Sequence, residues 1–200
     1  MLLFRGCAHV RAFTPCGYTS NDVILSSGSS IMIDIMNIQA LHFDELTARQ
    51  LFHILKLRQD IFFVEENIIY PDLDDMDEDS IHVFATTEKD NKTIIVSYAR
   101  VYFDPVEKHV KVGRVATAAA YRGQGIGGKV MRRCCEVARD RFKASEVWLD
   151  AQLHAVGFYK SMGFQVVSDV FMEAGIEHVR MIWRNLFICN HPRFSLASFS

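Results

Sequence analysis

The chain divides into short blocks of hydrophobic and polar positions whose periods predict a mixed α/β fold. Stretches rich in β-branched and aromatic residues predict strands over residues 31–38, 81–87, 93–103, 110–117, 147–151, 164–170 and 178–183. Asp104-Pro105 supplies a turn between the third and fourth stretches. No internal repeat and no linker interrupts this pattern, which indicates one domain.

Helical spacing appears in three places. Thr47 and Gln50 have the spacing of a capping box, which marks a helix start. Apolar residues follow at helical intervals: Leu51, Ile54, Leu55, Ile61 and Phe62. A longer helix is predicted over 125–142 from the apolar stripe Ile126, Val130, Cys134, Val137 and Ala138. A short helix is expected over 155–161, before Gly163.

Composition fits one globular domain whose ends differ from its middle. The chain has 200 residues, of which 50% are hydrophobic and 23% charged. Residues 1–34 are basic, contain Ser and Thr and are poor in acids, as organellar transit peptides are. A disordered extension, or a start at Met32 or Met36, explains the same composition. We therefore expect an extension over 1–34, a domain over 35–183 and a tail over 184–200.

The cysteines and the apolar runs indicate a cytoplasmic protein, or a mitochondrial or plastid one if 1–34 is a transit peptide. The five cysteines form no CxxC pair and fit neither a disulfide framework nor a zinc site, so we expect no metal. Cys134 and Cys135 are interpreted as helix packing, because no base stands beside them to activate a thiolate. No apolar run approaches the roughly 18 residues of a membrane span.

The net charge of −2 argues against a general nucleic-acid or membrane-surface binder, unless the charges are segregated. They are segregated. Residues 122–143 carry seven basic side chains against two acidic ones, whereas 65–79 carry eight acids and no base. An acidic segment and a basic helix would suit a cationic and an anionic ligand bound at neighbouring sites.

A glycine-rich loop, Gly123 to Gly128, opens the long helix directly after a strand. Glycines let the backbone approach an anion, and a helix N-terminus offers free N–H groups, so we expect a phosphate-bearing ligand. A Walker A loop would need a Ser or Thr after Lys129 to bind Mg²⁺, and Val130 stands there, so a nucleotide triphosphatase is not expected. A dinucleotide fingerprint also fits the glycine spacing, but residues 118–122 separate the loop from its strand and too few residues follow for a doubly wound domain.

The third interpretation rests on two motifs. The spacing Arg122-x-x-Gly125-x-Gly127 resembles motif A of the GNAT superfamily of acyl-CoA-dependent N-acyltransferases, and residues 158–164 resemble its F-Y-x-x-x-G-F motif. The resemblance covers about 35–183. It narrows to the ElaA-like branch on the following residues: Leu57, Arg58, Val64, Glu65, Glu66, Tyr70, Asp74, Asp77, Ala151, Gln152, His154, Ile176, His178 and Met181.

The resemblance implies a mixed, mostly antiparallel sheet flanked by helices, whose central strands splay to admit the pantetheine arm of acetyl-CoA. It implies N-acetyl transfer to a primary amine by direct attack in a ternary complex. Backbone groups of Val115, Ala116 and Thr117 would pair with the pantetheine, and one N–H there would polarise the thioester carbonyl. The loop would hold the pyrophosphate through Arg122, Gly123, Gln124, Gly125, Ile126, Gly127, Gly128 and Lys129.

Tyr159 is the expected general acid for the departing thiolate, and Glu65 is the first choice for the general base. Histidines are alternatives to Glu65 or contacts for the acceptor: His82, His154 and His178. Asp74 and Asp77 of the acidic segment are expected to draw in the amine, while Arg58 orders that segment by a salt bridge.

Two other functions stay open at this point. A non-catalytic acyl-CoA-binding or sensor module would retain the loop without turnover, and a nucleotide-binding regulatory domain would bind ATP or NAD in competition with CoA. The amine, which is a small molecule or a peptide, is not identified. The oligomeric state is also open, with a homodimer as one alternative.

Overall fold

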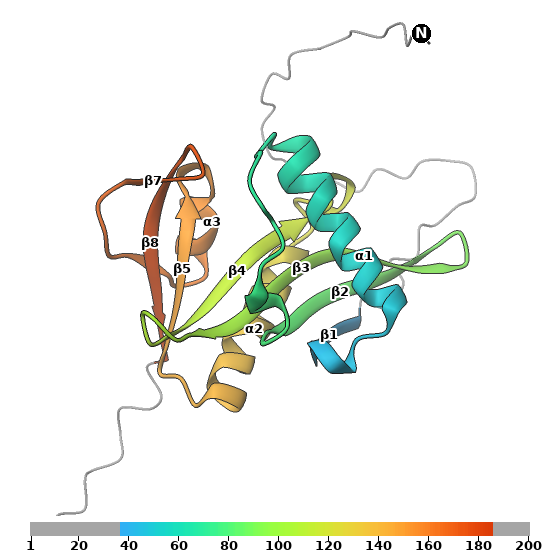
Figure 1. Cartoon of the computed structure of the whole chain (residues 1–200), viewed down its shortest axis with the longest axis horizontal. Coiled ribbons are helices and arrows are strands. Elements are labelled where there is room, and N and C mark those ends of the chain that lie inside the picture. Colours follow the sequence, from blue (N-terminus) through green and yellow to red (C-terminus); the bar gives the residue numbers. More distant parts are fainter. Residues whose placement is uncertain (1–36, 186–200) are drawn as a thin grey trace, which may run out of the picture. The chain divides into compact units, whose positions relative to one another are not determined.

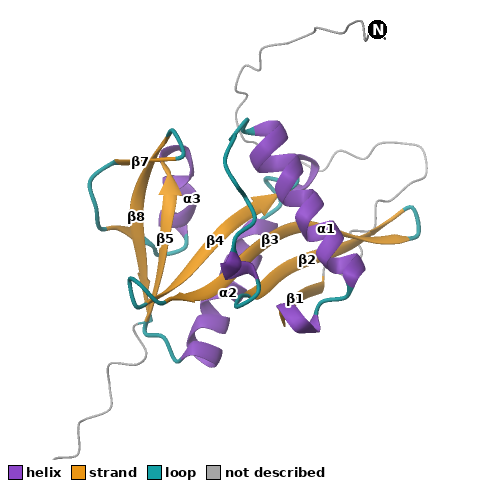
Figure 2. Cartoon of the chain, viewed as in Figure 1, coloured by secondary structure: helices purple, strands orange, loops and turns teal. Residues whose placement is uncertain are grey.

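Eight strands form one sheet in residues 37–185, the part of the chain that the structure, a computed structural model, describes (Figures 1 and 2). The strands are β1 Asn37–His42, β2 Ile81–Lys89, β3 Lys92–Asp104, β4 His109–Thr117, β5 Glu146–Gln152, β6 Gln165–Val166, β7 Phe171–Glu173 and β8 Ile176–Arg184. The α-helices are α1 Ala48–Arg58, α2 Ile126–Phe142 and α3 Val156–Ser161. A π-helix, Gln59–Glu65, continues α1, and 3₁₀ turns cover Phe43–Glu45, Asp75–Asp77, Ala119–Tyr121 and Leu153–Ala155.

The sheet follows the order β1-β2-β3-β4-β5-β8-β6, and β7 pairs with β8. All pairings are antiparallel except that of β4 with β5. These two parallel strands pair at one position, Lys111 opposite Trp148, close to the start of each. Beyond that pair they diverge, as Figure 1 shows. The splay that the resemblance implied is thus present, and the mostly antiparallel α/β sheet is confirmed.

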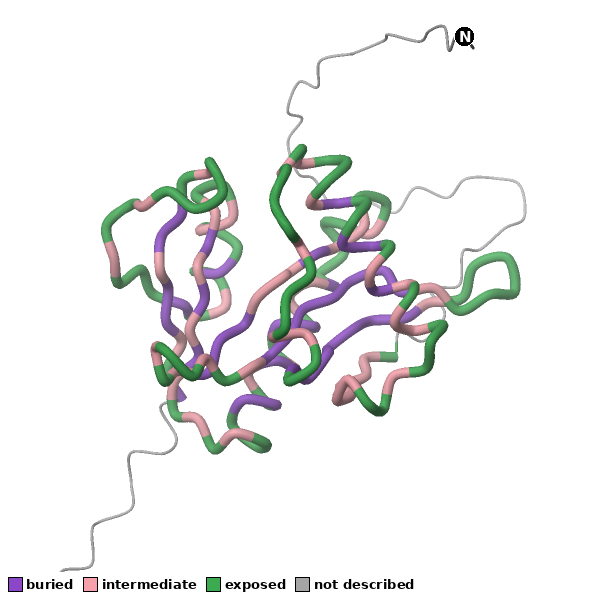
Figure 3. The backbone as a smooth tube through the Cα atoms, in the orientation of Figure 1, coloured by how far each residue is buried: buried purple, intermediate pink, exposed green. Residues whose placement is uncertain are grey.

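Helices cover both faces of the sheet (Figure 1). On one face, the apolar stripe of α2, which includes Val130 and Cys134, packs on buried side chains of the central strands. On the other face, Ile54 and Leu57 of α1 pack on Phe84 and other buried apolar side chains. Figure 3 shows the buried central strands between exposed loops. Because β2 and β3 are covered on both sides, their buried stretches are nearly continuous.

A bulge in β4 marks the start of the splay. Arg100 of β3 lies opposite Gly113, and Tyr98 lies opposite Ala116, so that two residues of β4 face one residue of β3. Arg114 takes up the bulge with a φ of +55°. Bulges bend a strand and are common beside active sites. Here the bend turns the end of β4 away from β5.

Most expected elements are confirmed, including the Thr47–Gln50 capping box. Two strand expectations are wrong in extent. The strand expected over 31–38 runs on to His42, and its part before Asn37 lies outside the described residues. The strand expected over 164–170 is reduced to Gln165–Val166, because the Ser168 hydroxyl, in place of a backbone carbonyl, accepts the N–H of Arg180. The expectations for 1–34 and for most of 184–200 lie outside the described residues.

No helix within residues 37–185 is both long and apolar enough to cross a membrane. In the same residues, no group of three or more His, Cys, Asp or Glu side chains is arranged to hold a metal ion.

Candidate active site

A cavity of about 710 Å³ opens where β4 and β5 diverge. Residues 111–115 of β4 form one wall, and side chains of β5, α3 and β8 form the other. The end of α1, the π-helix and the segment over residues 66–73 close a third side. Within residues 37–185, the cavity therefore lies where the edge of a central strand has no neighbouring strand. Such an edge offers backbone N–H and C=O groups to an extended ligand.

The glycine loop follows β4 and packs against its end. Gly123 and Gly125 both have a φ of +74°, a left-handed conformation that favours glycine. A Cβ on Gly127 would stand 3.2 Å from the Thr117 hydroxyl, so glycine permits this close approach. Helix α2 begins at Ile126 without a side-chain cap. Its first backbone N–H groups are therefore open to an anion, and the residues fit a pyrophosphate.

Arg122, at the start of the loop, is held from two sides. Its Nε donates to the Thr117 carbonyl at 2.8 Å, and its Nη2 donates to Glu65 Oε2 at 2.9 Å in a two-pronged pair. The hydrogen bond from Arg122 holds the pKa of Glu65 below its ordinary value. Glu65 is not one of the residues that line the cavity. The arrangement thus links Glu65 to the loop and does not support it as the general base.

Glu66, the next residue, does line the cavity. It is half-buried, and its Oε2 accepts a hydrogen bond from the Gln152 side chain at 3.0 Å. Gln152 stands directly opposite His178 in the β5–β8 pair, a relation that brings Cβ atoms to about 5 Å. The structure therefore groups Glu66, Gln152 and His178 in the cavity. The sequence pattern alone assigned Glu66 no functional role.

The His178 ring is held by one hydrogen bond to the backbone. Its ring Nδ1 lies 2.9 Å from the Ile176 carbonyl. A carbonyl only accepts, so Nδ1 carries the hydrogen, and in the neutral ring Nε2 keeps its lone pair. His154 also lines the cavity, from the exposed turn before α3. His82 does not line it. It is buried between the Tyr98 hydroxyl, at 2.8 Å, and the Asp77 carbonyl, at 2.9 Å.

Tyr159 of α3 lines the same cavity, and Phe158 and Phe164 pack edge-on against its ring. Burial raises the pKa of Tyr159 well above its ordinary value, and the charge of Glu66 adds to this. The phenol is therefore protonated at neutral pH and serves as a donor. This is the protonation state that a general acid requires before it acts.

Comparison with known proteins shows which family the chain belongs to. Residues 51–164 match the acetyltransferase (GNAT) family. The chain belongs to the GNAT family of acetyltransferases. Protein ElaA of Escherichia coli strain K12 is 36% identical over 146 residues, which cover 72% of this chain and 93% of ElaA. A UPF0039 protein of Synechocystis is 34% identical over 143 residues, or 71% of this chain and 91% of that protein.

Solved structures give the same family. The crystal structure of Escherichia coli ElaA has a TM-score of 0.66 and 34% identity, and covers 74% of this chain and 99% of that one. An acyl-CoA N-acyltransferase from Pseudomonas aeruginosa has a TM-score of 0.65 and 33% identity, with the same coverage. The likeness to the ElaA-like branch of the GNAT family is thereby confirmed. GNAT enzymes bind CoA and an acceptor, and use acetyl-CoA as the acetyl donor.

Three arginines pair with three aspartates of the acidic segment. We call the set Arg58, Arg100, Arg114, Asp72, Asp74 and Asp77 the arginine–aspartate network. Arg58 reaches Asp72 at 2.8 Å and Asp77 at 2.7 Å. Arg100 binds Asp74 at 2.6 Å and Asp77 at 2.7 Å. The expectation that Asp74 and Asp77 attract the amine assumed an uncompensated charge, and this arrangement does not support it. The expectation that Arg58 orders the segment is confirmed.

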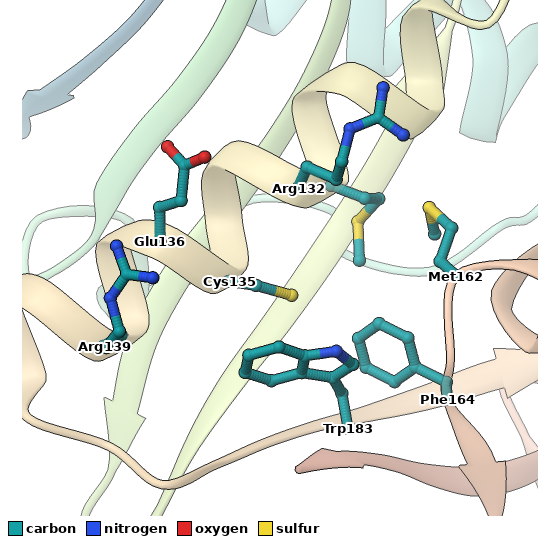
Figure 4. A pocket seen from close by; sticks show the side chains of 8 residues that line it. Arg132, Cys135, Glu136, Arg139, Met162, Phe164 and Trp183 are labelled. Carbon is teal, nitrogen blue, oxygen red and sulfur yellow. The ribbon is translucent and has the colours of Figure 1, made fainter. Parts of the chain in front are cut away.

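A second cavity, of about 190 Å³, lies along the flank of α2 (Figure 4). Cys135 projects toward the rings of Trp183 and Phe164 there. Burial raises the pKa of Cys135 to about 12, which agrees with its interpretation as a packing residue. Among the lining residues the one carboxylate, Glu136, is paired with Arg133 at 2.9 Å. The larger cavity, which holds Tyr159, Glu66 and His178, is therefore the stronger candidate for the active site.

Proposed function

We propose that this GNAT protein transfers an acetyl group from acetyl-CoA to the nitrogen of a primary amine, with both substrates bound at once. The proposal rests on the set of side chains that line one cavity. A protonated tyrosine and a carboxylate–amide–histidine group share the space between two splayed strands, next to an anion-binding loop.

The residues present fit acetyl-CoA. The open N–H groups at the start of α2, with Arg122 and Lys129, would hold the pyrophosphate. Residues Val115, Ala116 and Thr117 lie on the edge of β4 beyond its single pairing position with β5, and would pair with the pantetheine amides. A backbone N–H at the bulge would donate to the thioester carbonyl as negative charge develops on it. When bound, acetyl-CoA supplies the activated acetyl group.

The proton steps are assigned to side chains of the cavity. An alkylammonium has a pKa near 10.4, so His178 Nε2 first takes a proton, directly or through water. The neutral nitrogen bonds to the acyl carbon, and the carbon–sulfur bond breaks. Tyr159 donates its proton to the departing sulfur and regains one from the acylated nitrogen. The amine thus loses two protons in total, of which one ends on the CoA thiol and one enters solvent.

Tyr159→Phe tests the proposal. The ring packing is kept and the acid is lost, so kcat should fall about 10²-fold or more, while the Kd of acetyl-CoA measured by calorimetry stays the same. CoA release is followed with a panel of primary amines. Unchanged kcat would refute the role of Tyr159. Tight acetyl-CoA binding with no turnover on any amine would favour the sensor module instead.

A further inference from the structure

Three large apolar side chains line the cavity and are largely exposed to solvent. Phe63 of the π-helix is 54% exposed, and Tyr70 and Leu73 of the 66–73 segment are 65% and 56% exposed. Large apolar side chains gathered around one opening mark a ligand or interaction site more often than isolated ones do. They stand on the wall that faces β4 from the α1 side, away from the helix whose N-terminus would hold the pyrophosphate.

The carboxylates of the cavity differ in how their charge is compensated. Asp72 lies 2.8 Å from both Arg58 and Arg114. Asp150 lies 2.8 Å from Arg180 and 3.6 Å from Lys111. Both acids are therefore neutralised from within the protein.

Glu66 has a neutral partner instead, the Gln152 amide. Glu173, the remaining lining carboxylate, is exposed on β7 at the rim. Arg122 acts on Glu66 only through charge, since no hydrogen bond or ion pair joins them within the described residues. Glu66 is therefore the half-buried carboxylate of the cavity that an incoming cation can pair with directly. One such charge suits one ammonium group.

We propose that the acceptor is a monocationic primary amine on an apolar body, aromatic or branched aliphatic, such as an arylalkylamine. This inference rests on the proposed function and names its substrate class. The ammonium pairs with Glu66, and the apolar body covers Phe63, Tyr70 and Leu73. A polyamine or an aminoglycoside would place further cations against apolar walls and already paired acids, unless they reached the exposed Glu173 at the rim. Desolvating those cations without new partners is costly.

The test compares four amines at saturating acetyl-CoA: 2-phenylethylamine, 3-methylbutylamine, putrescine and ethylamine. We expect the two apolar amines to exceed putrescine in kcat/KM by about tenfold or more, the discrimination that small apolar differences give. Tyr70→Ala should raise KM for 2-phenylethylamine several-fold and leave ethylamine unchanged. Glu66→Gln should raise KM for both, because both present the same ammonium. Phe52→Ala, an exposed aromatic of α1 outside the cavity lining, is the matched control and should change neither.

The outcomes separate the two proposals. If putrescine is the better substrate, or if Tyr70→Ala affects ethylamine as much as 2-phenylethylamine, the acceptor class is wrong while the acetyltransferase activity stands. If none of the amines is acetylated although acetyl-CoA binds, the proposed function fails as well. A preference for the apolar amines that depends on Tyr70 supports both.

Discussion

Arg58→Met removes the buried cation that ties α1 to the 66–73 segment. The Arg58 side chain is fully buried and donates from Nε to Asp72, from Nη1 to Asp77 and from Nη2 to the Asp72 carbonyl, at 2.8, 2.7 and 2.6 Å. Its guanidinium also lies over the Tyr98 ring, 5.8 Å from the centroid. Methionine keeps an unbranched apolar stem, is shorter than arginine and makes none of the three hydrogen bonds.

The expected loss of stability depends on which ion pairs Asp72 and Asp77 keep after the substitution. Breaking a buried ion pair costs about 3–5 kcal/mol when one charge is left alone. Here Asp77 keeps Arg100 at 2.7 Å and Asp72 keeps Arg114 at 2.8 Å. The lower end is therefore expected, about 3 kcal/mol, which for a domain of this size lowers Tm by about 6–12 °C.

Urea unfolding of Arg58→Met and of wild type measures the difference. Arg133→Met is the matched control, because it removes an exposed pair with Glu136 and should change stability by no more than about 0.5 kcal/mol. Arg58→Met should also have a higher KM for the amine, because the 66–73 segment loses an anchor, and an unchanged Kd for acetyl-CoA. If Arg58→Met is no more destabilising than Arg133→Met, the arginine–aspartate network does not hold the segment.

Two further predictions concern pH and the glycine loop. Burial acts to raise the pKa of Asp77, but hydrogen bonds and charge from Arg58 and Arg100 outweigh it and the pKa is lowered. An unfolded aspartate titrates near pH 3.9, so the stabilisation by ionised Asp77 is complete above that pH and is lost as the pH falls below it. Urea unfolding of the wild type should therefore give a lower free energy of unfolding at pH 3 than at pH 5, and Asp77→Asn should make this difference smaller. Equal differences in the two proteins would contradict the assignment. Gly125→Ala places a side chain at a φ of +74° and should cost about 1–2 kcal/mol and weaken acetyl-CoA binding in calorimetry. Gly157→Ala, in α3 with open space around it, should instead stabilise the fold by up to about 1 kcal/mol. If both substitutions change the free energy of unfolding in the same direction, the argument from backbone conformation is wrong.

Local signals in the sequence were sufficient for most of the fold. The capping box at Thr47 and the stripe of α2 act over a few residues, so periodicity and spacing reveal them. The glycine loop is equally local, because its left-handed positions need glycine wherever they occur. The splay of β4 and β5 came from the resemblance, since no local pattern reports that two strands part.

Long-range pairing explains what the sequence pattern missed. The segment over residues 65–79 contains eight acids and no base, which suggests a free negative surface. Arg100 and Arg114 pair with its Asp74 from β3 and β4, 26 and 40 residues away in the chain. His82 was a candidate because its ring titrates near neutrality, yet burial lowers the pKa of His82 and its ring is bonded inside the protein. Neither outcome is visible without the folded arrangement of the strands.

Which of the two carboxylates, Glu65 or Glu66, lines the cavity depends on one turn of the backbone. In an α-helix, hydrogen bonds run from residue i+4 back to residue i, and Glu65 would continue the buried stripe through Ile54 and Ile61. The chain instead forms a π-helix over Gln59–Glu65, and the N–H of Glu66 donates to the Ile61 carbonyl at 2.9 Å, five residues back. The wider turn gives Glu66 the position that regular spacing assigns to Glu65. One carboxylate therefore enters the cavity and its neighbour turns to Arg122, so a single irregular turn serves both halves of the site.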